Sequence, residues 1–81
     1  MNLIRIPTRF FEDHQERELP TPEVHKATKS HYWISADDPA LPELLNDAEH
    51  YADMAPYMDP YYFGLCMSAR ATARAIRRTL G

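Results

Sequence analysis

The dipeptide Asp-Pro occurs twice in the chain, at residues 38–39 and 59–60, and it constrains the fold more than any other feature. An aspartate followed by proline is typical of a helix start, because the carboxylate caps free amides and proline needs no amide hydrogen bond in the first turn. After the first pair, apolar residues recur at spacings of three and four, the period of a helix with one buried face. They are Leu41, Leu44, Leu45, Ala48 and Ala52. This pattern predicts a helix over about 39–54, within the segment 37–54.

A second apolar stripe follows the second Asp-Pro pair and predicts another helix over 59–80. Its members are Tyr62, Leu65, Cys66, Ala69, Ala73, Ile76 and Leu80. The segment 55–58 contains Pro56 and breaks the first helix, so the connection is short and the two helices should pack antiparallel. Many small residues make the second helix slim, which favours close packing against the first helix or in a homodimer.

The first 36 residues show a different pattern, because β-branched residues and prolines replace the helical period. Residues 3–6 favour a short strand that Pro7 ends or places at a sheet edge. Residues 8–13 either extend this strand or form a short helix, and the two prolines of HQERELPTPE indicate an ordered loop. Residues 24–35 alternate like a second strand. We therefore expect an α+β fold, in which a two-stranded antiparallel β-ribbon in residues 1–36 is followed by an antiparallel helix pair.

With 81 residues, the chain has the length of one small domain, residues 1–81. A domain of this size buries only about 60 per cent of the surface that its unfolded chain exposes, so we expect modest stability. Cys66 is the single cysteine, which excludes an intramolecular disulfide. A helical core, a metal or a second subunit must supply the stability instead. No stretch of about 18 apolar residues and no signal-peptide core is present, so we expect a cytoplasmic protein.

The net charge of -3 hides an uneven distribution of charge. Residues 1–59 contain five basic and twelve acidic side chains, whereas residues 60–81 contain four arginines and no acid. These are Arg70, Arg74, Arg77 and Arg78. On a helix at 100° per residue they fall within about 100° of one another, so one side of the second helix is an arginine face.

Three interpretations of this arginine face compete. The arginines can pair with acids of the same chain, for which Glu43, Asp47 and Asp53 are candidates, and complement the negative end of the helix dipole. They can bind an acidic protein partner, or they can contact nucleic-acid phosphates as a small DNA-binding regulator does. The overall negative charge disfavours nucleic acid, because nonspecific DNA affinity comes mainly from neutralised phosphates. Internal pairing is the default explanation, and binding of an external partner has to account for the arginines better than it does.

A second candidate surface is aromatic and lies at the predicted turn between the helices. Tyr57, Met58 and Tyr61 gather there, and Tyr, Met and Arg are enriched in protein interfaces. The competing explanation is that a domain this small needs its aromatics for the core, where we expect Tyr62 and one aromatic residue of strand 24–35. The candidate partner-binding residues are Arg70, Arg74, Arg77, Arg78, Tyr57, Met58 and Tyr61.

No residue pattern specific to catalysis or to a cofactor is present. The four histidines are His14, His25, His31 and His50. They lack the spacing of a metal site, so we expect them at the surface or at helix caps, with a metal site as the alternative. Cys66 lies on an apolar stripe, where thiols are usually inert, and two glycines are too few for a glycine-rich phosphate loop. We expect no cofactor, no catalytic residue and no enzymatic activity.

Three segments of the chain resemble small uncharacterised proteins of actinobacteria and of the phages that infect them. They are FFEDHQERELPTP, HYWISADDPALPELLNDAEHYAD and SARATARAI, and the block DDPALPELL is the most specific. The resemblance covers about residues 10–76 and implies a phage or actinobacterial origin, with the host cytoplasm as the location if a phage encodes the protein. It implies no ligand and no catalytic residue.

Small phage proteins often bind and redirect a host protein. By this analogy we expect a non-enzymatic protein-protein interaction module whose partner is a host protein or a second copy of the chain. The alternative is a small DNA-binding regulator that uses the arginine face of the C-terminal helix. We expect neither a membrane nor a small molecule as partner.

Overall fold

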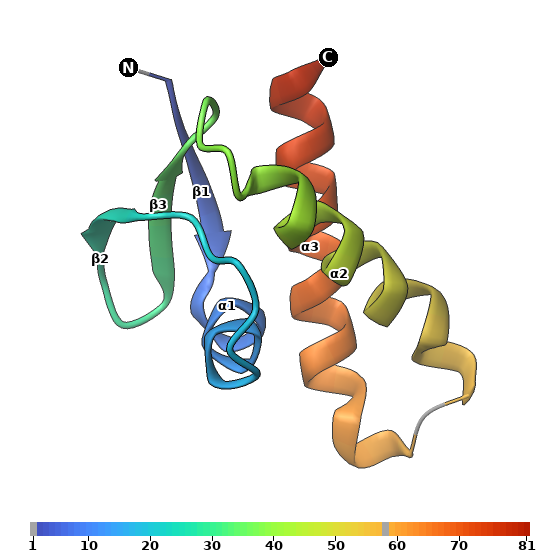
Figure 1. Cartoon of the computed structure of the whole chain (residues 1–81). Coiled ribbons are helices and arrows are strands. Elements are labelled where there is room, and N and C mark those ends of the chain that lie inside the picture. Colours follow the sequence, from blue (N-terminus) through green and yellow to red (C-terminus); the bar gives the residue numbers. More distant parts are fainter. Residues whose placement is uncertain (1, 58) are drawn as a thin grey trace.

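The computed structural model describes residues 2–57 and 59–81, and Figure 1 shows its arrangement. In chain order, the described elements are β1 (Leu3–Pro7), α1 (Thr8–Glu16), β2 (Val24–Ala27), β3 (His31–Ser35), α2 (Leu41–Met54), the 3-10 turns η1 (Ala55–Tyr57) and η2 (Pro60–Tyr62), and α3 (Phe63–Leu80). The prediction of an α+β fold is confirmed. The ribbon differs from the prediction, because it contains a third strand.

The three strands form one antiparallel sheet in the order β1-β3-β2. The prediction of a single strand over 24–35 is wrong, because this segment is a hairpin of β2 and β3. The Thr28 amide closes the turn by donating to the His31 carbonyl at 2.8 Å. The turn contains no glycine or proline, so the alternating pattern runs through it without a visible break. Strand β1 lies at a sheet edge and ends at Pro7, as the sequence predicts.

Residues 8–13, for which the sequence left strand and helix open, belong to α1. Phe10, Phe11 and His14 face the core and are fully buried. Positions i, i+1 and i+4 lie on one side of a helix, whereas a strand would point Phe10 and Phe11 to opposite faces. After the helix, Glu18 adopts a φ of 58°, the left-handed conformation with which chains commonly turn away from a helix end.

Helices α2 and α3 form the predicted antiparallel pair, joined at the lower end of Figure 1. Both begin later than predicted. The Asp38 carboxylate accepts hydrogen bonds from the amides of Glu23 and Ala40, so it organises the loop before α2 and Ala40 is the N-cap. Asp59 does act as a cap, since its carboxylate accepts from the Tyr61 amide at 2.9 Å, but the element that it caps is η2.

The hydrophobic core lies between the helices and one face of the sheet. Its buried members are Ile4, Ile6, Phe10, Phe11, Ile34, Leu41, Leu44, Ala48, Leu65, Ala69, Ala73 and Ile76. Most of both predicted stripes is here, but Tyr62 is 46 % exposed and Leu80 is 58 % exposed. Tyr62 belongs to η2. Because a 3-10 turn is wound more tightly than an α-helix, its side chain is not aligned with the buried face of α3. Tyr32 of β3 packs against the core, as expected of one aromatic in this segment.

Candidate functional site

The arginine face of α3 is exposed to solvent. Its members Arg70, Arg74, Arg77 and Arg78 all have exposed side chains. The opposite side of α3 carries the buried residues Ala69, Ala73 and Ile76. The amphipathic pattern of the sequence therefore sets the direction of this face, because burial of the apolar stripe turns the arginines outward.

Among these four arginines, only Arg77 forms an ion pair with an acid within the described residues. Its guanidinium contacts the carboxylate of Glu49 in α2, which was not one of the predicted acids. The other three arginines form no ion pair with any residue that the structure describes. Among the predicted acids, Asp47 pairs with Arg17 and His14 of the α1 region instead. The predicted internal neutralisation of the face is thus wrong for most of it, because packing places those acids elsewhere.

The predicted tyrosines lie at the junction of α2 and α3, and both are strongly exposed. Tyr57 is 84 % exposed and Tyr61 is 78 % exposed. Phe63 and Met67, to which no sequence pattern pointed, are also exposed on the first turns of α3. We call Tyr57, Tyr61, Phe63 and Met67 the junction surface. The seventh candidate, Met58, lies outside the described residues.

An open apolar hollow of about 290 Å³ lies at this junction. Its lining residues are Ala55, Pro56, Phe63, Cys66 and Met67. Phe63 and Met67 are one helical turn apart and project to the same side of α3. Cys66 is buried, as expected for a thiol on the apolar stripe. The hollow can accept an apolar side chain and presents no charged side chain to it.

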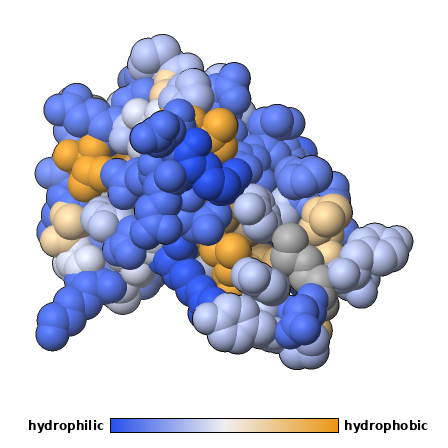
Figure 2. Space-filling model, turned by 60° about the horizontal axis from the view of Figure 1, so that its bottom comes forward, coloured by the Kyte–Doolittle hydropathy of each residue, from blue (hydrophilic) through white to orange (hydrophobic). Residues whose placement is uncertain are grey.

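Figure 2 shows the molecule from the end where α2 and α3 join. Hydrophilic residues cover most of this view, and strongly hydrophobic residues appear as small separate patches. Tyrosine stands among the mildly hydrophilic residues of such a scale because of its hydroxyl, although its ring buries a large apolar area in an interface. The junction surface is therefore amphipathic.

The arginine face adjoins the junction surface at Arg70, which follows Met67 by three residues, and extends from there to the other end of α3. Phe63 begins the helix and Arg78 lies in its last turn. At 1.5 Å per residue, these two residues are about 22 Å apart along the helix axis. The predicted binding residues therefore extend along α3 from the junction to Arg78 and do not form one compact site.

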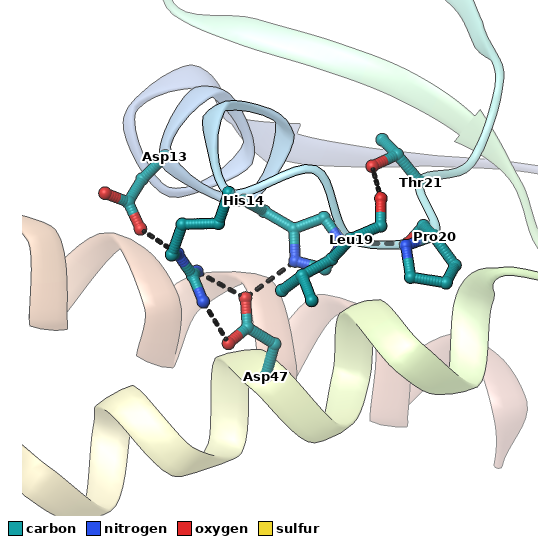
Figure 3. A network of polar contacts seen from close by, with 7 residues as sticks. Asp13, His14, Leu19, Pro20, Thr21 and Asp47 are labelled. Atoms are coloured by element: carbon teal, nitrogen blue, oxygen red, sulfur yellow. Dashed lines mark hydrogen bonds and ion pairs between the residues drawn. The ribbon is translucent and has the colours of Figure 1, made fainter.

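The tertiary structure also assembles a polar network that no sequence pattern indicated (Figure 3). The His14 Nδ1 atom lies 2.6 Å from Asp47 Oδ2, and its Nε2 lies 2.9 Å from the Pro20 carbonyl oxygen. A carbonyl oxygen only accepts, so Nε2 carries a proton, and a second proton must lie between Nδ1 and Oδ2. The expectation of surface histidines holds for His25 and His50 and is wrong for His14, which is fully buried.

Arg17 adds a guanidinium to the same network. It donates to both carboxylate oxygens of Asp47, at 2.9 and 2.6 Å, and to Asp13 at 2.9 Å. It also lies over the Tyr51 ring, 4.8 Å from the centroid. The hydrogen bond with Asp47 raises the pKa of Arg17, although desolvation opposes this. Burial works against ionisation of the Asp47 carboxyl, but the hydrogen bonds from Arg17 and His14 outweigh it and lower the pKa of Asp47.

This network has a structural rather than a catalytic geometry. Both ring nitrogens of His14 are engaged and its ring is buried, so it cannot take a proton from a substrate. The bidentate pair of Arg17 and Asp47 instead restricts how α1 sits on α2. The helical spacing of Phe10, His14 and Arg17 was the one sequence signal that could have placed these side chains on a common face. Across the described residues, no group of three or more His, Cys, Asp or Glu side chains is arranged to hold a metal ion.

Comparison with known proteins leaves the geometry as the main guide to function. The sequence matches no family model, and neither curated proteins nor solved structures include a significant match. In the part of the chain that the structure describes, no helix is both long and apolar enough to cross a membrane. The phage or actinobacterial origin remains a prediction from the resemblance alone.

Proposed function

We propose that this chain is a non-enzymatic protein-binding domain whose partner docks on the junction surface. The observation that carries this proposal is the exposure of Tyr57 (84 %) and Tyr61 (78 %) at the junction, where Pro56, the residue before Tyr57, lines an apolar hollow. Tyrosine rings combine a large apolar area with a hydroxyl that can hydrogen-bond, and they are enriched among the residues that dominate binding energy.

The local structure supports this proposal because turns fix the backbone that carries the tyrosines, and a ring contact orients Tyr61. Pro56 and Pro60 belong to successive 3-10 turns, and the Asp59 carboxylate accepts a hydrogen bond from the Tyr61 amide. The Tyr61 ring meets the Tyr62 ring edge-on, with 5.2 Å between their centroids. A side chain that is already ordered loses less conformational entropy when a partner covers it. We expect the partner to insert an apolar side chain into the hollow that Phe63 and Met67 line.

The size of a stable interface limits how the partner binds. Such interfaces bury about 800 Å² on each side, and a fully covered aromatic side chain contributes about 150–250 Å². Four side chains therefore supply most but not all of a standard interface, so neighbouring residues at the end of α2 must join the contact. The resemblance to small phage proteins supports a host protein as the partner, and the slim α3 supports a second copy of the chain as the alternative.

Site-specific photo-crosslinking tests the proposal. A benzophenone amino acid replaces Tyr57 in one variant and the exposed Glu43 on α2 in a matched control. In the presumed actinobacterial host, we expect a discrete crosslinked product from position 57 that is absent from position 43. Mass spectrometry of this product distinguishes a host protein from a second copy.

A second pair of variants checks that the product depends on the junction surface. The substitutions Tyr61→Ser and Phe63→Ser should remove the crosslink from position 57, whereas Arg70→Ala should leave it unchanged. Thermal unfolding followed by circular dichroism confirms that each variant is folded. Identical products from positions 57 and 43, or no product from either, would contradict the proposed function.

A further inference from the structure

A basic groove of about 410 Å³ lies between β1 and α3, away from the junction surface. Elements far apart in sequence supply its basic side chains, namely Arg5 from β1, His31 from β3, and Arg74 and Arg78 from α3. None of the residues that line this groove is acidic. Arg74 and Arg78 of the arginine face therefore belong to one wall of a concave site whose other wall comes from the sheet.

The guanidinium groups of this groove have no internal counter-charge. Arg5, Arg74 and Arg78 form no ion pair with any described residue. Three like charges around one hollow repel one another and raise the local concentration of anions. On the α3 wall, the small side chains of Ala71 and Ala75 leave room between the guanidinium groups. These features fit a phosphate group, which guanidinium binds in a bidentate manner.

Arg5 and His31, which line the groove, also belong to the sheet strands that neighbour Trp33. In the strand register, Arg5 of β1 and Lys26 of β2 lie on either side of Trp33 of β3. Their neighbours Ile4 and Ile34 point to the opposite face, into the core. His31 connects the two regions, because it lines the groove and its ring lies 6.3 Å from the Trp33 ring. A tryptophan thus stands at the edge of a basic, acid-free groove.

We propose that the groove binds the phosphodiester backbone of single-stranded nucleic acid and that a base of this strand stacks on Trp33. Basic grooves flanked by aromatic rings are the usual means of binding single strands, since phosphates are neutralised while every base offers a π-face. The site shares no residue with the junction surface and goes beyond the proposed protein-binding function.

Trp33 is the reason to favour nucleic acid over an acidic peptide. The Lys26 ammonium lies 4.7 Å from the centroid of the ring. Trp33 is half-buried, whereas Lys26 is exposed. A cation–π contact with an exposed cation is worth about 0.5–1 kcal/mol, whereas stacking of a base is worth about 1–3 kcal/mol. A base therefore displaces Lys26 favourably, and the released ammonium can contact a phosphate. An acidic peptide would use the arginines but would gain nothing comparable from the ring.

Fluorescence anisotropy of a labelled dT12 oligonucleotide tests this proposal. Three arginine–phosphate contacts predict that the logarithm of the affinity falls with the logarithm of salt concentration with a slope of about -2. The double variant Arg74→Ala, Arg78→Ala should weaken binding at least tenfold at ~20 mM NaCl and make the slope shallower, because phosphate contacts dominate affinity at low salt. Trp33 is the only tryptophan, so an unlabelled oligonucleotide should also quench the intrinsic fluorescence.

The matched control is the double variant Arg70→Ala, Arg77→Ala. It removes the same charge from the same helix, but neither residue lines the groove. We expect its affinity for dT12 to stay within about threefold of the wild type, since only long-range attraction is lost. Equal losses in the two double variants would overturn the proposal, because net charge alone would then explain binding. Circular dichroism melting shows that each variant is folded.

Competition separates the sources of negative charge. Neither a glutamate dodecapeptide nor inorganic phosphate, at the same concentration of negative charge, should displace dT12 as well as unlabelled dT12 does. Displacement by the peptide with equal efficiency would replace nucleic acid by an acidic protein segment and overturn the proposal. Absence of dT12 binding at ~20 mM NaCl would do the same, because electrostatic binding is strongest at low salt.

Discussion

Arg17 and Arg74 carry the same guanidinium group, but the fold uses them in opposite ways. Arg17 is 33 % exposed, binds Asp47 through two of its nitrogens and lies over the Tyr51 ring. Arg74 lines an open groove beside other cations and has no acidic partner among the described residues. The first arginine holds α1 on α2, whereas the second contributes a charge that the folded chain does not use. An arginine of the second kind is the better candidate for contact with another molecule.

The largest expected effect comes from removing the acid that the first region shares. Asp47→Ala leaves the buried His14 and the guanidinium of Arg17 without their common acceptor. Breaking a buried charged pair costs about 3–5 kcal/mol, and partial access to water reduces this to about 2–4 kcal/mol here. Urea unfolding measures the loss of stability. The control is Glu43→Ala on the same helix, which should change stability by less than about 0.5 kcal/mol.

Substituting alanine for Arg17 and for Arg74 tests most directly whether the two arginines differ in their contribution to stability. Arg17→Ala should lower the free energy of unfolding by about 1–2 kcal/mol, because it removes charge-assisted hydrogen bonds from a partly buried carboxylate. Arg74→Ala should change it by less than about 0.5 kcal/mol, since no described residue depends on that side chain. If urea unfolding gives similar losses for both variants, the division into structural and available arginines is wrong.

Acid titration sharpens the contrast, because only the first region contains a carboxyl with a lowered pKa. A carboxyl group whose pKa is lowered by folding stabilises the protein fully at pH values above the pKa of the unfolded chain, which is about 3.9 for aspartate. This contribution is lost as the pH falls through the lower pKa of folded Asp47. Wild type should therefore lose stability on acidification more steeply than Asp47→Asn. Urea unfolding at pH 6, 5, 4 and 3 measures the difference, and a difference that stays constant over this range speaks against the assignment.

Among the arginines that form an ion pair, the smallest effect is expected for Arg77. Its ion pair with Glu49 is exposed, since the Arg77 side chain is 64 % accessible. Exposed pairs contribute about 0.2–1 kcal/mol and are screened by salt. Arg77→Ala should lower stability by about 0.2–0.5 kcal/mol at 20 mM NaCl and by less at 500 mM. An effect as large as that of Arg17→Ala, or one independent of salt, would place Arg77 in the structural class.

The regular elements that the sequence predicted are those whose signals are local. The apolar spacing of α2 and α3 and the cap at Asp59 depend on residues within one or two turns of each other. The strand before Pro7 was found for the same reason. The hairpin was missed, because its turn at residues 28–30 contains no glycine or proline and only the pairing of β2 with β3 defines it.

The candidate sites divide in the same way. Exposure of the arginine face follows from the period of α3, so the sequence alone indicated it. The sequence could not show that Arg5 would join this face across a groove, because these residues meet only when β1 packs on α3. The buried pair of His14 and Asp47 likewise joins residues 33 positions apart.

The sequence by itself determined the helix pair, its amphipathic direction and the uneven division of charge between the two parts of the chain. Only the tertiary structure showed which charged side chains form ion pairs within the chain and which are free to contact another molecule. The reason is the separation in sequence between the residues that interact. Capping and helical periodicity act over a few residues, whereas ion pairing needs atoms within about 4 Å and so depends on how distant segments pack.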